Sequence, residues 1–260
     1  MPNNVFIPEL LSVGVTEKLG KAIKLYNIVN VENLGEKTEG DTVKFISTEY
    51  IGDAGVVLAG TEIPKADFTD TTKSAPVKKY AKGVIFTEEE IMSGFGDVQG
   101  RAENQIAKSV AAGVENALFA ELKAIAGAMA HAATKFDVDE IGQALVKFGE
   151  DIDDEKYLLV SPVDFANLRK DPNFIVKTNE KVDSVGEIFG CTVVVSGRVA
   201  ANEAFIVKLD ALTVALKQDV KIKVQEEADD DTVLVNGRTH AAVALTDEAG
   251  AIKITVTPAP

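Results

Sequence analysis

The segment VQGRAENQIAKSVAAGVENALFAELKAIAGAMA, residues 98–130, decides how this chain is organised. In this segment apolar side chains recur at steps of three and four and are flanked by alanines, which predicts an amphipathic helix with one buried stripe. The stripe consists of Ile106, Val110, Val114, Leu118, Leu122, Ile125 and Met129. At 1.5 Å per residue the helix would be a rod of about 50 Å, well beyond the three turns typical of globular domains. We therefore expect a structural spine whose stripe lies in the core.

The chain before this helix is predicted to be extended. DTVKFIST (41–48) alternates apolar and polar residues with the period of a strand, and APVKKYAKGVIF (75–86) is a second candidate strand. The stretch between them, 51–70, is rich in glycine and small residues and is too long for a tight hairpin. Loops of that length inside a compact domain are usually functional. Two interpretations stay open, an ordinary β-meander and a projecting two-stranded arm.

Capping residues indicate four helix starts. A Ser, Thr or Asp at this position accepts a hydrogen bond from a backbone amide of the first turn, and a Glu three residues later can complete a capping box. The candidates are Thr16 for a short helix over 16–27, Thr87 with Glu90, Asp137 with Glu140, and Ser161 before Pro162. The last two would begin the helices of a helix–strand–helix unit over 137–182.

The chain after residue 184 is predicted to be rich in β-strands, which makes the fold class α+β. Asn236-Gly237 is the dipeptide typical of a two-residue hairpin turn. The candidate strands are CTVVVS (191–196), AFIVK (204–208), ALTVALK (211–217), VKIKVQ (220–225) and IKITV (252–256).

Composition limits the possible functions. Lys and Arg number 27 against 41 Asp and Glu, a net charge of −14 that would repel a phosphate backbone and argues against sequence-specific binding of nucleic acid. No apolar run of about 18 residues is present, so we expect no membrane span, and the N-terminus lacks the features of a signal peptide. The single Cys191 cannot form an internal disulfide, which fits a reducing compartment.

Reactive residues are too few and too scattered to predict an enzyme. His131 and His240 lie far apart in the sequence without a metal-ligand motif, and Cys191 precedes three valines as a buried small side chain would. The glycines at 94, 96 and 100 miss the spacing of a dinucleotide-binding loop by one residue. We expect no catalytic residue, no metal site and no cofactor.

Two charged clusters are candidate subunit contacts. The acidic run lacks the alternating pattern of an EF-hand, so a solvated or subunit-facing loop is the better interpretation. The lysines fall in residues 71–87, which hold no acidic side chain, so they could dock on an acidic neighbour or simply form a solvated strand face. The acidic run is Glu226, Glu227, Asp229, Asp230 and Asp231, and the lysines are Lys73, Lys78, Lys79 and Lys82.

The order of these parts, and three short stretches, resemble a known family. The stretches are Gly186-x-Ile188-x-Gly190-x-x-Val193-Val194-x-Ser196, the strand start Ala204-Phe205, and Arg238 followed by His240-Ala241-Ala242. Together with the arm, the ribbon, the spine and the returning β region, they resemble the major capsid proteins of tailed bacteriophages, which have the HK97-like fold.

This resemblance implies an α+β subunit in four parts. They are an N-terminal arm (1–34), an extended E-loop ribbon (35–90), a peripheral domain with the spine helix (91–136 and 218–260), and an axial domain (137–217). Such subunits assemble as hexamers and pentamers into an icosahedral virion head that encloses double-stranded DNA without reading its sequence, carries a portal protein and is built in the host cytoplasm.

The same resemblance leaves some alternatives open. The recognisable body begins near residue 30, so a separate scaffolding protein is expected. An encapsulin-like bacterial compartment shell shares the fold, and a tail-tube protein or a non-capsid enzyme or binding module are more distant possibilities. The long spine helix argues against a tail tube, whose subunits are mostly β.

Overall fold

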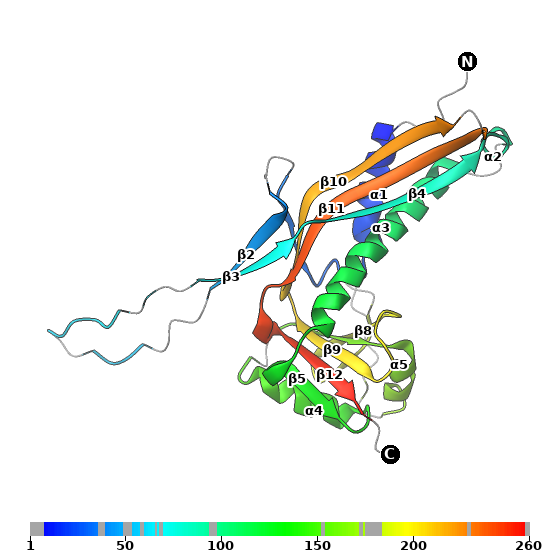
Figure 1. Ribbon diagram of the computed structural model, residues 1–260. Coiled ribbons are helices and arrows are strands. Elements are labelled where there is room, and N and C mark those ends of the chain that lie inside the picture. Colours follow the sequence, from blue (N-terminus) through cyan, green and yellow to red (C-terminus); the bar gives the residue numbers. More distant parts are fainter. Residues whose placement is uncertain are drawn as a thin grey trace.

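The computed structural model describes residues 8–35, 40–48, 54–57, 60–65, 67, 70–93, 98–151, 154–171, 174, 184–227 and 230–257. These residues form two sheets bridged by a long helix, and a two-stranded ribbon projects from the body (Figure 1). The helices are α1 Pro8–Ala22, α2 Glu88–Met92, α3 Val98–Lys123, α4 Val138–Leu145 and α5 Pro162–Leu168, with short 3₁₀ turns η1 Gly127–Met129, η2 Val146–Phe148 and η3 Glu248–Gly250. The strands are β1 Asn30–Asn33, β2 Thr42–Thr48, β3 Asp70–Pro76, β4 Lys78–Thr87, β5 Ala130–Ala133, β6 Lys156–Val160, β7 Ser184–Ile188, β8 Cys191–Val195, β9 Glu203–Lys208, β10 Leu212–Glu227, β11 Thr232–Leu245 and β12 Ala251–Val256.

Helix α3 confirms the predicted long helix with a buried stripe, but it is shorter than predicted. Its 26 residues make a rod of about 39 Å, and the apolar stripe from Ile106 to Leu122 is buried. The helix ends at Lys123 rather than near residue 130. Gly127 has a φ of 70°, a left-handed conformation that glycine adopts without strain, and β5 begins at Ala130.

The four-stranded sheet, ordered β1-β10-β11-β4, packs on the N-terminal half of α3 and on α1. Apolar side chains from all of these elements except β1 form one core cluster: Leu11, Val15 and Leu19 of α1, Val98, Ile106 and Val110 of α3, Phe86 of β4, Val220 and Ile222 of β10, and Val233 and Val235 of β11. These two helices therefore cover one face of the sheet.

Strand β10 corrects two of the predictions. Segments 211–217 and 220–225 were expected to be separate strands, but they belong to one 16-residue strand whose register shifts between Leu216 and Lys221. Asn236-Gly237 was expected to be a turn, but it lies in the middle of β11, where Gly237 pairs with Ile222. The hairpin instead turns between Glu227 and Thr232, within the acidic run.

Gly237 occupies its place because helix α3 passes close to the sheet. A Cβ atom at this position would overlap Cγ2 of Ile106 in α3. The β-branched isoleucine cannot move aside easily, since its χ1 is nearly fixed in a helix. Glycine at 237 therefore sets the distance between helix and sheet rather than a turn.

Gly237→Ala is expected to lower the free energy of unfolding by about 1–3 kcal/mol, because the added methyl group overpacks the contact with Ile106. Chemical denaturation of the variant and the parent measures this difference. Gly55→Ala is the matched control, since nothing lies within 4 Å of a Cβ at that exposed position. Equal stability of the Gly237→Ala variant and the parent would contradict the close packing described here.

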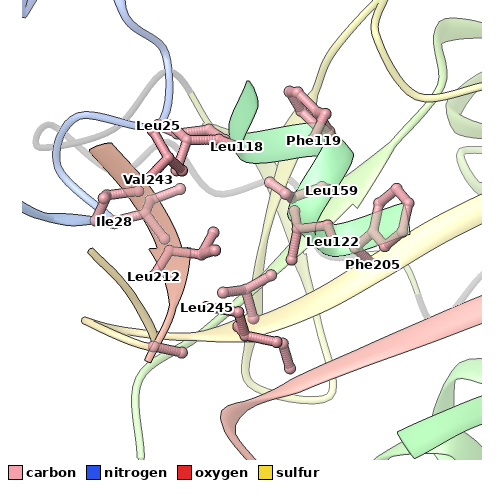
Figure 2. Packing of buried hydrophobic residues seen from close by; sticks show 14 of the residues in the cluster. Leu25, Ile28, Leu118, Phe119, Leu122, Leu159, Phe205, Leu212, Val243 and Leu245 are labelled. Atoms are coloured by element: carbon pink, nitrogen blue, oxygen red, sulfur yellow. The ribbon is translucent and has the colours of Figure 1, made fainter. Parts of the chain in front are cut away.

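The six-stranded sheet, ordered β5-β12-β9-β6-β8-β7, is covered on both faces. One face packs on the C-terminal half of α3, where Leu118, Phe119 and Leu122 meet Leu159 and Phe205 (Figure 2). The other face packs on α4 and α5. We expected β12 to lie with the other strands after residue 218, but it pairs with β5 and β9 in this sheet.

The ribbon confirms the projecting arm rather than the meander. Strands β2 and β3 form a two-stranded sheet of their own, and the described residues between them lie away from the body (Figure 1). Among the described residues of the ribbon, Phe45 and Ala75 at its base are packed, against Ala242 and Ala244 of β11. The predicted strand over 75–86 is broken at Val77, and β4 continues into the four-stranded sheet.

Three of the four predicted helix starts are confirmed. Thr87 and Glu90 form both hydrogen bonds of a capping box, and Asp137 and Ser161 each accept from a backbone amide in the first turn of their helix. The fourth is wrong. Thr16 lies inside α1, where its hydroxyl donates to the carbonyl of Ser12 at 2.9 Å, a local bond that a helix interior tolerates.

A buried carboxylate joins three parts of the chain. Glu115 in the middle of α3 is 2% exposed. Its Oε2 lies 2.7 Å from Nη1 of Arg198 in the β8–β9 loop, and its Oε1 accepts from the backbone amide of Lys24 after α1. Nε of Arg198 also donates to Oδ1 of Asn116 at 2.9 Å. The ion pair therefore fixes the spine helix to the six-stranded sheet and to the N-terminal segment.

Candidate subunit-interaction surfaces

The four candidate lysines do not form one patch on the ribbon. Lys73 lies in β3 and forms an ion pair of 3.3 Å with Glu248 of the same chain. Lys78, Lys79 and Lys82 lie in β4, which pairs with β11 and forms an edge of the four-stranded sheet. The four lysines therefore do not form a single strand face.

The three lysines of β4 also divide between the two faces of its sheet. Side chains alternate along a strand, so Lys78 and Lys82 share the face of Tyr80, which packs against Gly113 of α3. Lys79 is on the opposite face, directly across from His240 of β11. All three are exposed.

The acidic run lies at the far end of the four-stranded sheet. Glu226 and Glu227 end β10, while Asp230 and Asp231 form the turn into β11, and all four are exposed. Asp229 lies outside the described residues. The run is larger than predicted, because the amide of Glu88 donates to the carbonyl of Asp231 at 3.0 Å and so places α2 beside it.

We therefore define an acidic tip that consists of Glu88, Glu89, Glu226, Glu227, Asp230 and Asp231, all of them exposed. The sequence signal for its α2 residues was the capping motif at Thr87, which was interpreted only as a helix start. In the portion of the chain that the structure describes, no group of three or more His, Cys, Asp or Glu has the arrangement of a metal site.

A basic surface that the sequence analysis missed lies on the uncovered face of the four-stranded sheet. Gly237 of β11 faces α3. Because side chains alternate along a strand, its neighbour Arg238, and His240 two residues further on, point away from the helix. Lys79 lies across from His240, and Lys221 across from Arg238. The missed signal was the alternation Lys221-x-Lys223 next to Arg238-x-His240, which was hidden by the interpretation of 236–237 as a turn.

The pKa of His240 is affected by the positive charge of this surface. Its partial burial lowers its pKa first, and the cations Arg238, Lys79 and Lys217 lower the pKa further. Its Nδ1 lies 3.1 Å from Oε1 of Gln218. The other histidine, His131 in β5, has its Nε2 3.0 Å from Oε2 of Glu140 in α4, and this polar contact links the two elements.

Cys191 is buried as predicted. It is 0% exposed at the start of β8, and desolvation raises the pKa of its thiol to about 12. The glycines at 94 and 96 lie outside the described residues, and Gly100 lies in the first turns of α3. Within the described residues, no helix is long and apolar enough to cross a membrane.

Cys191→Ser is expected to assemble as well as the parent, because the buried thiol has no role in assembly. Native Cys191 should also resist thiol reagents at pH 8, because the thiolate is the form that reacts.

The raised pKa of Cys191 also predicts how stability changes with pH. The unfolded thiol loses its proton near pH 9 while the folded one keeps it to about 12, so this residue favours unfolding increasingly as the pH rises between these values. Labelling of the native protein at the rate of a free thiol would contradict both statements.

Comparison with known proteins identifies the family of this chain. The sequence matches the phage capsid protein family over residues 70–254. The major capsid protein of Staphylococcus phage phiMR11 is 31% identical over 262 residues, which cover 97% of this chain and 94% of that protein.

Solved capsid structures share the fold at low sequence identity. The capsid of Ralstonia phage GP4 has a TM-score of 0.71 at 12% identity, over 90% of this chain and 88% of that one. A virus-like particle from Pyrococcus furiosus has a TM-score of 0.67 at 15% identity, over 95% and 98% of the two chains. The two sheets, the helix between them and the projecting ribbon are thus a capsid fold. With a family match over most of its length and a relative above 30% identity, the chain belongs to the phage capsid protein family, and it is a structural protein rather than an enzyme.

Proposed function

We propose that this chain is the subunit of an icosahedral phage head, in which it assembles as hexamers and pentamers around double-stranded DNA. The single observation that carries this proposal is the projecting ribbon. An isolated two-stranded ribbon is marginally stable in water, so its far part needs another surface to lie on. In a shell that surface is the adjacent subunit.

The side chains of the ribbon support this role. The described residues beyond the two strands, 54–57 and 60–65, are exposed, with Val56 100% and Ile63 71% accessible. The base is held firmly by the cluster around Phe45 and by the ion pair between Lys73 and Glu248. A ribbon that is anchored at its base and exposes the apolar side chains of Val56 and Ile63 at its far part is suited to reach a neighbour.

We also propose an HK97-like division of the subunit, with boundaries adjusted to the two sheets. The four-stranded sheet with α1 and the spine helix α3 would be the peripheral domain, and the six-stranded sheet the axial domain. Several segments then change place relative to the expected boundaries, because α1, β1 and the start of β10 join the peripheral domain and β5 joins the axial domain. Strand β4 belongs with the peripheral domain rather than the E-loop, and β12 belongs with the axial domain.

The remaining parts of the proposal concern partners and location. A net charge of −14 suits a container, because a negative lining would leave the packaged DNA mobile. We propose a separate scaffolding protein and a portal protein as further partners, and assembly in the host cytoplasm. An encapsulin-like compartment has the same fold, but the relative at 31% identity is a phage major capsid protein, which favours the phage head.

Negative-stain electron microscopy of the purified chain, alone and produced with the other head proteins of its phage, tests the proposal. Closed shells, or free hexamers and pentamers, are the expected result. DNA protected from nuclease inside particles from infected cells would support the enclosed genome. A uniform monomer under all of these conditions would contradict the proposed function.

A further inference from the structure

The uncovered face of the four-stranded sheet has an unusual charge for so acidic a protein. Directly opposed residues of antiparallel strands share a face, so the pairs Lys79–His240, Lys221–Arg238 and Lys223–Asn236 all lie on the side away from α3. Lys79 and Lys223 are exposed, and Arg238 is half-buried. We call Lys79, Lys223 and Arg238 the basic sheet face.

Arg238 lies at the centre of this face with an unmet hydrogen-bonding capacity. Its Nε is buried and has no hydrogen-bond partner among the described residues. Buried polar atoms are nearly always paired, and a guanidinium pairs best with a carboxylate or a phosphate. Because this atom is covered in the isolated subunit, Arg238 would have to change its rotamer to meet a partner, and a carboxylate or phosphate is the group with which its guanidinium would then pair.

The rest of the same subunit leaves this part of the sheet open. The base of the ribbon covers the neighbouring part of the face, where Phe45 and Ala75 pack on Ala242 and Ala244. From His240 toward the hairpin turn, the described residues place no second layer over β11. The helices α1 and α3 both lie on the other side of the sheet.

The acidic tip is the complementary surface. No ion pair joins its six carboxylates to a cation within the described parts of the chain, and all six are exposed. Strand β11 connects the two surfaces, because Arg238 lies six residues from Thr232 at the turn, which is about 20 Å along an extended strand. This spacing separates the tip from Arg238 of its own subunit, and Lys223 lies four residues, about 13 Å, from Glu227 on the same strand.

We propose that the acidic tip of one copy docks on the basic sheet face of a second copy. The proposal rests on the proposed shell function and deepens it by assigning one contact between subunits. Both surfaces are present once in every copy, so each subunit offers one tip and accepts one tip, a heterologous contact that closes into a ring when the rotation permits. Tip against tip or face against face would place like charges together, so the charge pattern also selects the orientation.

Nucleic acid is the alternative anion, and the charges favour it less. A strand of DNA on this face would pass near the six carboxylates of the tip on the same subunit, where the phosphates would be repelled. The tip of a second copy supplies carboxylates for the face and at the same time finds cations for itself. Only this occupant satisfies both surfaces.

Charge reversal in pairs tests the contact. The face variant is Lys79→Glu with Lys223→Glu, the tip variant is Glu227→Lys with Asp230→Lys, and the four-fold variant combines them. All four side chains are exposed, so folding should be preserved, which circular dichroism and thermal melting verify. The fraction of each chain recovered in assembled particles is measured by sedimentation under conditions in which the parent assembles.

We expect each pair of reversals to reduce the assembled fraction by about five- to tenfold, and the four-fold variant to recover it to within about twofold of the parent. Lys108→Glu with Lys170→Glu changes the net charge as the face variant does, at exposed sites elsewhere, and is the matched control for that variant, expected to assemble normally. High salt should weaken the reversal effects, because it screens the new repulsion.

Several outcomes would overturn the docking. A face variant that assembles like the parent would do so, as would a four-fold variant that is no better than either pair, or a control that fails equally. Loss of co-purified nucleic acid in the face variant without any effect of the tip variant would assign the face to nucleic acid instead. Particle formation by the parent is scored separately, so failure of the contact and failure of the shell function are distinguished.

Discussion

Arg198→Met is expected to lower the free energy of unfolding by about 3 kcal/mol, the largest loss we predict for any exposed or half-buried position. The substitution leaves the carboxylate of Glu115, whose side chain is 3% exposed, without its cation. Within the described part of the chain, the amide of Lys24 would then be its one remaining donor. A buried charge that has lost its partner keeps its desolvation cost, which is why removing one member of such a pair is more damaging than removing both.

The double variant Glu115→Leu with Arg198→Met separates this cause from a loss of packing. We expect it to recover most of the stability lost in Arg198→Met, because neither a buried charge nor an orphaned partner remains. Chemical denaturation of the single and double variants measures the coupling. If the double variant is no more stable than Arg198→Met, the ion pair does not carry the effect and the arginine acts through its contacts alone.

Leu118→Ala is expected to cost about 2–5 kcal/mol of stability. Leu118 is 1% exposed and lies beside Leu25, in one core cluster with Leu159 of the six-stranded sheet and Leu245 of β11 (Figure 2). Alanine would leave a cavity that backbone elements from three directions cannot collapse to fill.

Thermal and chemical unfolding of Leu118→Ala measure this loss. Leu209→Ala provides the matched control, since Leu209 is 40% exposed and its truncation should change stability by no more than about 0.5 kcal/mol. A melting temperature unchanged in Leu118→Ala would refute the buried stripe on which the interpretation of the spine helix depends.

The features that could be predicted from the sequence are those determined by neighbouring residues. The apolar stripe of α3 follows from a helical period within one segment, and the capping hydrogen bonds of Thr87, Asp137 and Ser161 span only three residues. The same holds for the buried strand β6 and for Cys191 at the head of an apolar run. Each of these features could be predicted because the sequence pattern and its physical cause lie in the same short stretch of the chain.

The errors arose where a distant partner decides the structure. Asn236-Gly237 has the local pattern of a turn, but α3 requires a residue without a side chain at 237, and β10 and β4 hold the segment in a strand. Likewise β10 is continuous because β11 pairs along both of its predicted halves.

The candidate contacts were predicted only in part, for the same reason. The acidic residues of 226–231 were found, since they are consecutive. Their neighbours in α2 and the basic sheet face were missed, because strand pairing, rather than sequence proximity, brings these side chains together. The three β4 lysines were found as a run, but alternation along the strand divides them between two faces.

The parallel pairing of β1 with β10 has a consequence for how the subunit is made. Asn30 aligns with Thr213, so the strand that follows α1 has no partner until most of the chain has left the ribosome. At about 5–20 residues per second, that interval lasts roughly 10–40 s. Contacts this remote also slow the folding reaction itself, because a long loop must close before they form. We therefore expect the N-terminal segment to be secured late in a newly made subunit, and the nascent chain to depend on protection from aggregation during that time.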